Sequence, residues 1–168
     1  GSLLYKRSAA GRAHRHLADG GRCLHRGNQE KAEDEFRAGL KLKPNHGALC
    51  GALASLLVSK EDYDEAFQLL QIAQEIHPRD MTLAVLLGRC QLARGRKGHA
   101  VKLLAGVPAT DNAFLDANIV LADIAESDGD IALAVTFLEG GIQSASAARA
   151  RPYNRDLRRL KALLEPSS

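Results

Sequence analysis

The sequence contains no tryptophan, and aromatic residues make up only 4% of its 168 residues. Because β-sandwiches and β-barrels depend on aromatic and β-branched side chains, this shortage argues against an all-β fold. No apolar run approaches the roughly 20 residues that cross a bilayer as a helix. Gly1 and Ser2 are typical of a cloning scar, which predicts that the native N-terminus is missing. We therefore interpret residues 1–10 as a tag scar followed by the remnant of an upstream helix or a flexible tail.

The sequence also has few cysteines, and none of them lies in a CxxC motif. Structural zinc sites use Cys and His ligands at short, paired spacings, which Cys23, Cys50 and Cys90 do not have. We predict small, buried hydrophobic side chains at these positions and no metal site. Three unpaired cysteines favour a reducing, cytoplasmic location. Localisation stays undetermined, and a periplasmic location stays open because the native N-terminus is predicted to be missing.

Motifs for catalysis and for phosphate binding are missing as well. The segment GRCQLARGRKGHA at residues 88–100 is rich in glycine and basic residues, but it lacks the GxxxxGK[ST] spacing of a phosphate-binding loop. No Ser/His/Asp or Cys/His set lies in a strand-to-helix turn that would activate a nucleophile. The sequence predicts a protein that is not an enzyme, with no catalytic residue and no cofactor.

The sequence does contain a repeating pattern of residue types. Its period is the number of residues that separates Ala32 from Ala66 in the sequence. An alanine recurs at this period, a glycine or alanine precedes it at a constant distance, and a large apolar residue follows it by one helical turn. These three columns consist of Ala32, Ala66, Ala100 and Ala134; Gly20, Ala54, Gly88 and Ala122; and Phe36, Leu70, Leu104 and Leu138. Small residues let two antiparallel helices approach closely, and the large residue fills the space between helix pairs.

The positions of proline, glycine and helix-capping residues predict pairs of helices along most of the chain. Pro44 and Pro78 end two of the second helices, and an early Gly106 and Pro108 predict that the second helix of the third pair is short. The expected first helices are 11–26, 46–59, 80–94 and 112–127, and the expected second helices are 29–43, 62–77, 97–106 and 130–145. Candidate N-caps are Asn28, Asp62, Asp80, Asp111 and Asp130.

This pattern resembles the tetratricopeptide repeat family, whose unit is a 34-residue helix-turn-helix. The resemblance covers residues 11–146, and it implies an all-α fold in which about four repeats form a right-handed superhelix. The repeats are expected at 11–44, 45–78, 79–112 and 113–146. Tyr153, Leu157, Leu160 and Leu164 at helical spacing add a C-terminal capping helix at 149–165. One departure is that Cys23, Leu57, Gln91 and Ala125 stand where the family prefers an aromatic residue.

The resemblance implies that the first helices line a concave groove that binds partner segments. The groove would be small and apolar in its first half and acidic in the fourth repeat, so the expected partner is an apolar protein or peptide segment with a basic end. The family's carboxylate clamp is absent, because Leu17, Gly21, Ser55 and Val85 occupy its positions. The candidate groove residues are His14, Leu17, Ser55, Val58, Thr82, Val85, Arg89, Asp116, Ile119, Asp123 and Glu126.

These observations predict a scaffold for protein–protein interaction that belongs to a larger assembly. An Ala-, Arg- and Gly-rich composition suggests a bacterial secretion, pilus or polysaccharide-export setting. Self-association through the terminal helices is an alternative. A second alternative is nucleic-acid binding through the basic ends, since residues 1–31 carry seven Lys or Arg against two acids and residues 149–168 carry six against two. The scarcity of aromatic residues disfavours this second alternative.

Overall fold

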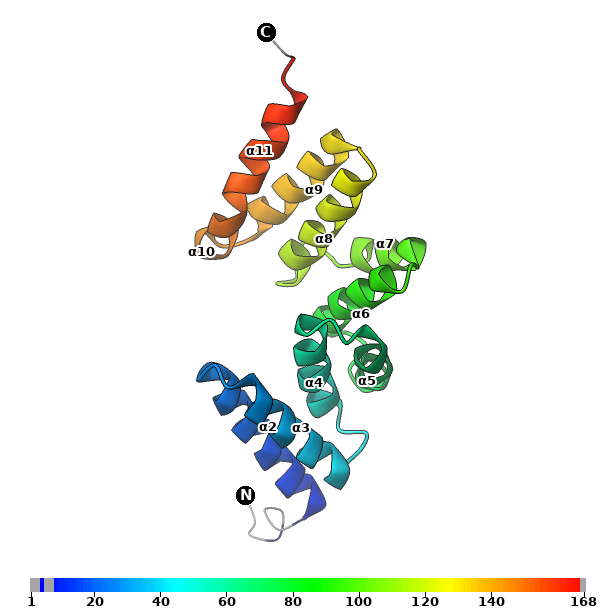
Figure 1. The fold of residues 1–168 in the computed structure, drawn as a ribbon, viewed down its shortest axis with the longest axis vertical. Helices are drawn as coiled ribbons and strands as arrows, with labels where there is room; N and C mark the ends of the chain where they lie inside the picture. The colour runs from blue at the N-terminus through cyan, green and yellow to red at the C-terminus, as the bar shows by residue number, and fades with distance from the viewer. Residues whose placement is uncertain (1–3, 5–7, 167–168) are drawn as a thin grey trace. The chain divides into compact units, whose positions relative to one another are not determined.

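A computed structural model describes residue 4 and residues 8–166, and the regular structure in this part of the chain is helical (Figure 1). The predicted all-α class is confirmed. The chain divides into two compact units, Gly1–Arg94 and Gly95–Ser168. The first contains α2 (Ala9–His25), α3 (Gln29–Leu42), α4 (Gly47–Ser59), α5 (Tyr63–Ile76) and α6 (Met81–Ala93). The second contains α7 (Lys97–Ala105), α8 (Phe114–Ser127), α9 (Ile131–Ser144), α10 (Ala147–Ala150), the 3-10 helix η1 (Arg151–Tyr153) and α11 (Asn154–Leu164).

The paired helices from α2 to α9 begin and end within two residues of the predicted bounds. The second helix of the third pair is short, as predicted: α7 has nine residues and ends just before Gly106. The first helix begins at Ala9 rather than at residue 11, because the Ser8 side chain accepts a hydrogen bond from the Gly11 amide and caps the helix there. Residues 1–3 and 5–7, which we expected to be a tag scar and a helix remnant or tail, lie outside the described residues.

Three of the five predicted N-caps are confirmed by hydrogen bonds at helix starts. The side chains of Asn28, Asp80 and Asp130 each accept a backbone N–H bond, of 3.0 Å in all three cases. Asp62 stands at the N-cap position of α5 without a side-chain cap bond. The prediction for Asp111 was wrong, because its carboxylate accepts from the Ala113 amide at 2.8 Å and so closes a turn that precedes α8.

In the first unit, the core forms where small and large residues of the repeating columns meet. Ala32 and Ala66 are completely buried, and Phe36 and Leu70 are buried beside them. A Cβ atom on Gly20 would lie 2.6 Å from Cδ1 of Phe36, so only glycine lets α2 and α3 pack this closely. The predicted columns therefore do pack as the core of this unit.

An ion-pair network ties α3, α4 and α5 together on the surface of the first unit. The Arg37 guanidinium donates to both carboxylate oxygens of Glu65, at 2.6 and 2.9 Å, and also to Glu33. Lys60, just after α4, binds the same Glu33 carboxylate. The pKa of Glu33 and of Glu65 is lowered, chiefly by the hydrogen bonds from Lys60 and Arg37 respectively.

In the second unit, α8, α9 and α11 share one core. Ala134, Leu138 and Leu160 are buried in it, and Tyr153 and Leu157 pack against its edge. The predicted capping helix at 149–165 takes the form of α10, η1 and then α11, which begins at Asn154. Pro152 lies in the first positions of η1, where its missing N–H is tolerated. Leu164 is 49% exposed, so it contributes less to the core than its spacing suggested.

Candidate functional site

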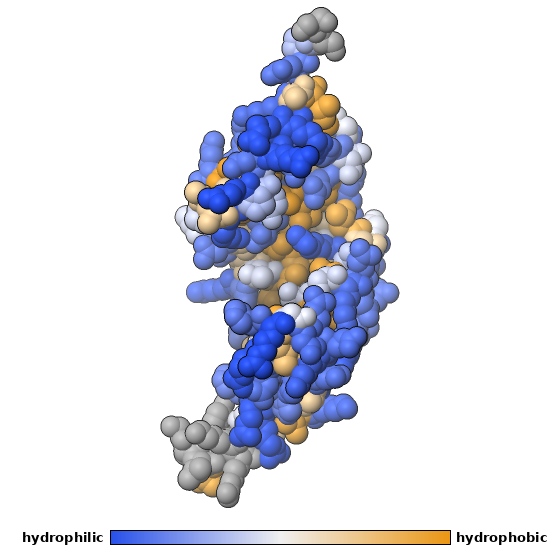
Figure 2. All heavy atoms as spheres, turned by 60° about the vertical axis from the view of Figure 1, so that its left-hand side comes forward, coloured by the Kyte–Doolittle hydropathy of each residue, from blue (hydrophilic) through white to orange (hydrophobic). Residues whose placement is uncertain are grey.

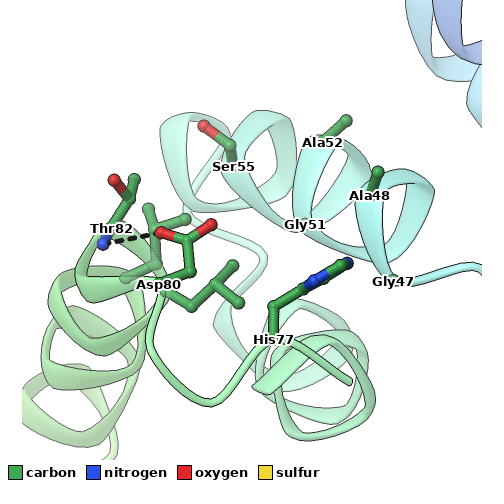
Figure 3. A pocket seen from close by; sticks show the side chains of 10 residues that line it. Gly47, Ala48, Gly51, Ala52, Ser55, His77, Asp80 and Thr82 are labelled. Atoms are coloured by element: carbon green, nitrogen blue, oxygen red, sulfur yellow. Dashed lines mark hydrogen bonds between the residues drawn. The ribbon is translucent and has the colours of Figure 1, made fainter. Parts of the chain in front are cut away.

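A pocket of about 410 Å³ opens on the first unit, between α4, the turn from α5 to α6, and the start of α6 (Figure 3). Its wall is mostly apolar, and polar side chains stand at its edge. The lining residues are Gly47, Ala48, Gly51, Ala52, Ser55, His77, Asp80, Thr82, Leu83 and Leu86. This is a concave surface formed by two of the helices that the sequence predicted to line a groove.

The wall on α4 consists of small residues at helical spacing. Gly47, Gly51 and Ser55 follow one another at intervals of four residues, which places them on one face of the helix. A Cβ atom on Gly51 would lie 3.3 Å from Cδ2 of Leu83, and one on Gly47 would lie 2.7 Å from the His77 ring. The two glycines therefore let α4 lie close to Leu83 and to the His77 ring, the residues on the other side of the pocket.

The opposite wall comes from the α5–α6 turn and the first turns of α6. Leu83 is buried and Leu86 is half-buried, which gives this wall its apolar surface. Asp80 caps α6 by accepting from the Thr82 amide at 3.0 Å, so its carboxylate is fixed at the edge of the pocket (Figure 3). Thr82 and Ser55 are both exposed and supply hydroxyl groups there.

A histidine holds the first turn of α4 at one end of the pocket. His46 is the N-cap of α4, and its ring atom Nδ1 accepts from the Leu49 amide at 3.3 Å. Burial lowers the pKa of His46, and the nearby charges of Lys43, His14 and His77 act in the same direction. A backbone hydrogen bond of His46 acts in the opposite direction, and the net change is a lowered pKa.

The predicted groove residues of the first unit occupy different environments. Ser55 and Thr82 line the pocket together. His14 and Arg89 are exposed, and Leu17 is half-buried. Val58 and Val85 are 7% and 4% exposed, which leaves them little surface for a partner. These two valines belong to the core.

Among the pocket residues that sequence reasoning missed are the two contributed by the turn between repeats, His77 and Asp80. Asp80 was predicted only as a helix cap, and His77 was not among the candidate groove residues. His77 precedes Pro78 and Asp80 follows it in the turn between repeats, and that turn closes one side of the pocket. The repeat period could have placed this turn beside the first helix of the preceding repeat.

Two of the three predicted acidic groove residues of the second unit, Asp116 and Glu126, are bound by the chain's own arginines. Arg149 donates to Asp116 at 3.0 Å, and Arg159 makes two bonds to the Glu126 carboxylate, at 2.6 and 3.0 Å. The bond from Arg159 lowers the pKa of Glu126. Ile119 is half-buried against the core of α8, α9 and α11, and Asp123 is exposed.

The positive charge at the two ends of the chain is also partly neutralised by ion pairs with the chain's own acidic residues. Arg22 binds Asp19 within α2, and Lys161 of α11 binds Glu139 of α9. Hydrophilic side chains dominate the face seen in Figure 2, with apolar side chains visible between them. These internal ion pairs reduce the positive charge that the ends can offer to a phosphate backbone.

Two of the three cysteines behave as small hydrophobic side chains. Cys50 and Cys90 are completely buried, and burial raises the pKa of both thiols, that of Cys90 to about 11. Cys23 is half-buried. Within residue 4 and residues 8–166, no group of three or more His, Cys, Asp or Glu side chains is arranged to hold a metal ion. No helix in that part of the chain is both long enough and apolar enough to cross a membrane.

Residues 57–113, from the end of α4 to the start of α8, match the family model described as a tetratricopeptide repeat. Residues 57–113 therefore match a tetratricopeptide repeat, and the fold is that of solved tetratricopeptide repeat structures, as the repeating columns predicted. Repeats of this family are interaction modules for other proteins, so the coarse prediction of a protein-interaction scaffold is confirmed. A search of curated proteins returned no match to the sequence.

Solved structures similar to this chain include two of MamA. One has a TM-score of 0.66 at 16% identity, over 79% of this chain and 77% of that one. MamA 41-end from Desulfovibrio magneticus RS-1 has a TM-score of 0.65 at 15% identity, over 92% and 98% of the two chains. The thermophilic tetratricopeptide protein TTC0263 of Thermus thermophilus has a TM-score of 0.52 at 17% identity, over 90% and 98%. At these identities the likeness shows the fold alone.

Proposed function

We propose that the chain is a non-enzymatic scaffold whose first unit binds a segment of a partner protein in the pocket between α4 and α6. The observation that carries the proposal is the 410 Å³ pocket, whose α4 wall consists of small side chains and whose α6 wall consists of leucines. Such a surface accepts a bulky apolar side chain that the scaffold itself does not supply. Val58 and Val85 are not part of this proposal because they are buried.

The acidic group at the edge of the pocket adds a second requirement on the partner. The Asp80 carboxylate is held there by its bond to the first turn of α6. A Lys or Arg next to the inserted apolar side chain would pair with it. The predicted basic end of the partner is therefore assigned to Asp80. Asp116 and Glu126 already bind Arg149 and Arg159.

The wider setting that we infer is a module of a larger assembly. A bacterial secretion, pilus or polysaccharide-export system agrees with the Ala-, Arg- and Gly-rich composition. The fold does not distinguish among these systems.

Selection of peptides from a displayed random library tests the pocket. We expect peptides that share a bulky apolar residue and a neighbouring Lys or Arg. Ser55→Phe should fill the pocket and weaken these peptides by tenfold or more, whereas Gln68→Phe, which adds the same ring to an exposed position of α5, should leave affinity unchanged. Asp80→Asn keeps an N-cap side chain and should remove only the preference for the basic residue. Equal binding to wild type and Ser55→Phe would contradict the proposal.

Self-association is a second candidate, and exposed leucines on α11 favour it. Leu163 and Leu164 are 60% and 49% exposed at the end of this helix. Sedimentation velocity over a wide concentration range should then show a dimer that Leu163→Glu removes. A mass that stays at the monomer value at every concentration would eliminate this candidate.

A further inference from the structure

We propose that the first turn of α4 is a pH-sensitive wall of the pocket, held in place by the neutral ring of His46 and released when that ring is protonated. The effect on partner binding rests on the proposed function. The effect on α4 itself rests only on the geometry of the helix cap.

The cap requires one protonation state of the ring. Nδ1 of His46 accepts the Leu49 N–H at 3.3 Å, so the single ring proton of the neutral form must be on Nε2. A protonated imidazole carries a proton on both nitrogens and cannot accept this bond. It would also place a positive charge at the positive end of the α4 dipole. Both changes favour opening of the first turn.

The surroundings of the ring also oppose its protonation. Three groups face it from neighbouring elements: Lys43 from the end of α3, His14 from α2 and His77 from the end of α5. All three groups act to lower the pKa of His46, as burial of the ring does. A positive charge on the His46 ring is therefore opposed from three neighbouring elements.

The same turn forms one end of the pocket. Gly47 and Ala48, the first two residues of α4, line the pocket beside the His77 ring (Figure 3). A Cβ atom on Gly47 would lie 2.7 Å from Nε2 of His77, so the backbone of this turn is in direct contact with a second imidazole ring. Opening of the turn moves the wall on which a partner side chain would rest.

The direction of the pH dependence follows from the His46 pKa, which is lowered from the ordinary value of 6.5 mainly by burial. A lowered pKa means that the unfolded chain binds the proton more readily than the folded chain. The stability that His46 contributes is complete above about pH 6.5 and is lost as the pH falls through that value towards the folded pKa.

Amide-resolved hydrogen exchange by NMR on the whole chain tests the cap without any partner. Between about pH 8 and about pH 5, the protection of the Leu49 amide, corrected for intrinsic exchange, should fall about fivefold, the size expected for loss of an N-cap. The Lys31 amide is an internal control. It occupies the same place in α3 and donates to Asn28, which does not titrate, at 3.0 Å.

Two variants separate the cap from other pH effects. His46→Asn supplies an acceptor that does not titrate, so Leu49 protection should become independent of pH. His14→Gln replaces a neighbouring imidazole and keeps the cap, so the acid-induced loss should persist. Constant Leu49 protection in the wild type, or an equal loss in His46→Asn, would overturn the proposal. Failure to select any peptide that depends on the pocket would contradict the proposed function and would leave this result unaffected.

Discussion

Arg159 of α11 forms two hydrogen bonds to Glu126 of α8, so the C-terminal helix binds an acid that the sequence assigned to a partner. Arg149 donates one hydrogen bond to Asp116, and the separation along the chain is the same for both pairs. The C-terminal segment thus binds two acidic residues of α8, the first helix of the preceding repeat. Charge recognition in the second unit is at least partly internal.

Reversal of the Arg159–Glu126 pair gives the first prediction. Arg159→Glu places two carboxylates together and should lower the melting temperature, whereas adding Glu126→Arg should restore part of the loss. Both groups are exposed, so the effect should be small and should shrink in high salt. Thermal melting by circular dichroism at low and high salt measures it. No recovery in the double variant would mean that the two side chains do not interact in solution.

The two adjacent glycines of α2 should respond oppositely to the same substitution. Gly20→Ala places a Cβ 2.6 Å from Cδ1 of Phe36 and should lower the unfolding free energy by about 1–3 kcal/mol. Gly21 has open space around its Cα, so Gly21→Ala should raise it by up to about 1 kcal/mol through helix propensity. Urea unfolding of both variants measures the difference. Equal effects would mean that α2 and α3 pack less closely than described.

Much of the fold could be predicted because the repeating columns, to which Gly20 belongs, consist of residues at helix contacts. The tiny, alanine and large apolar columns report direct helix contacts, and every member of the alanine column is completely buried. Helix ends were predictable where a cap or a proline sets them, as at Asn28 and Pro78. The start of α8 was predicted two residues early, because Asp111 closes a separate turn before the helix begins at Phe114.

The site was less predictable because it depends on contacts between helices. The pattern of exposed and buried residues within a single helix does not specify those contacts. Ser55 and Thr82 were found because they lie on exposed faces of first helices. Val58 and Val85 were assigned to the same face, but neighbouring helices cover them. His77 lies in a turn, and its role follows from contact with Gly47, which begins α4 and is separated from it in the chain by the whole of α5. Such contacts become visible only when the repeats are packed.

The network around Arg37 should make the first unit sensitive to acid. The Arg37 hydrogen bonds lower the pKa of Glu65 below its ordinary value of 4.5. The stability that this carboxylate contributes is therefore present above about pH 4.5 and is lost as the pH falls through the lowered value. Glu65→Gln should cost about 0.5–1 kcal/mol near neutral pH, because the pair is partly exposed and screened by solvent.

A matched control for this network lies on the same helix. Glu75 is an exposed glutamate of α5, and Glu75→Gln should leave the acid branch of the pH–stability curve unchanged. Chemical unfolding between about pH 3 and about pH 7 measures the unfolding free energy of the wild type, Glu65→Gln and Glu75→Gln. If the curve of Glu65→Gln coincided with that of the wild type, the Arg37 pair would be without influence on stability.

The buried thiols of Cys50 and Cys90 give this chain natural reporters of local opening. Alkylating reagents react with the thiolate, and burial raises the pKa of both groups while covering their sulfur atoms. Near neutral pH, each sulfur becomes reactive only while its own helix is transiently displaced. Since Cys50 is in α4 and Cys90 is in α6, mass spectrometry of the alkylated protein would time the opening of these two helices separately, without a dye or an introduced cysteine.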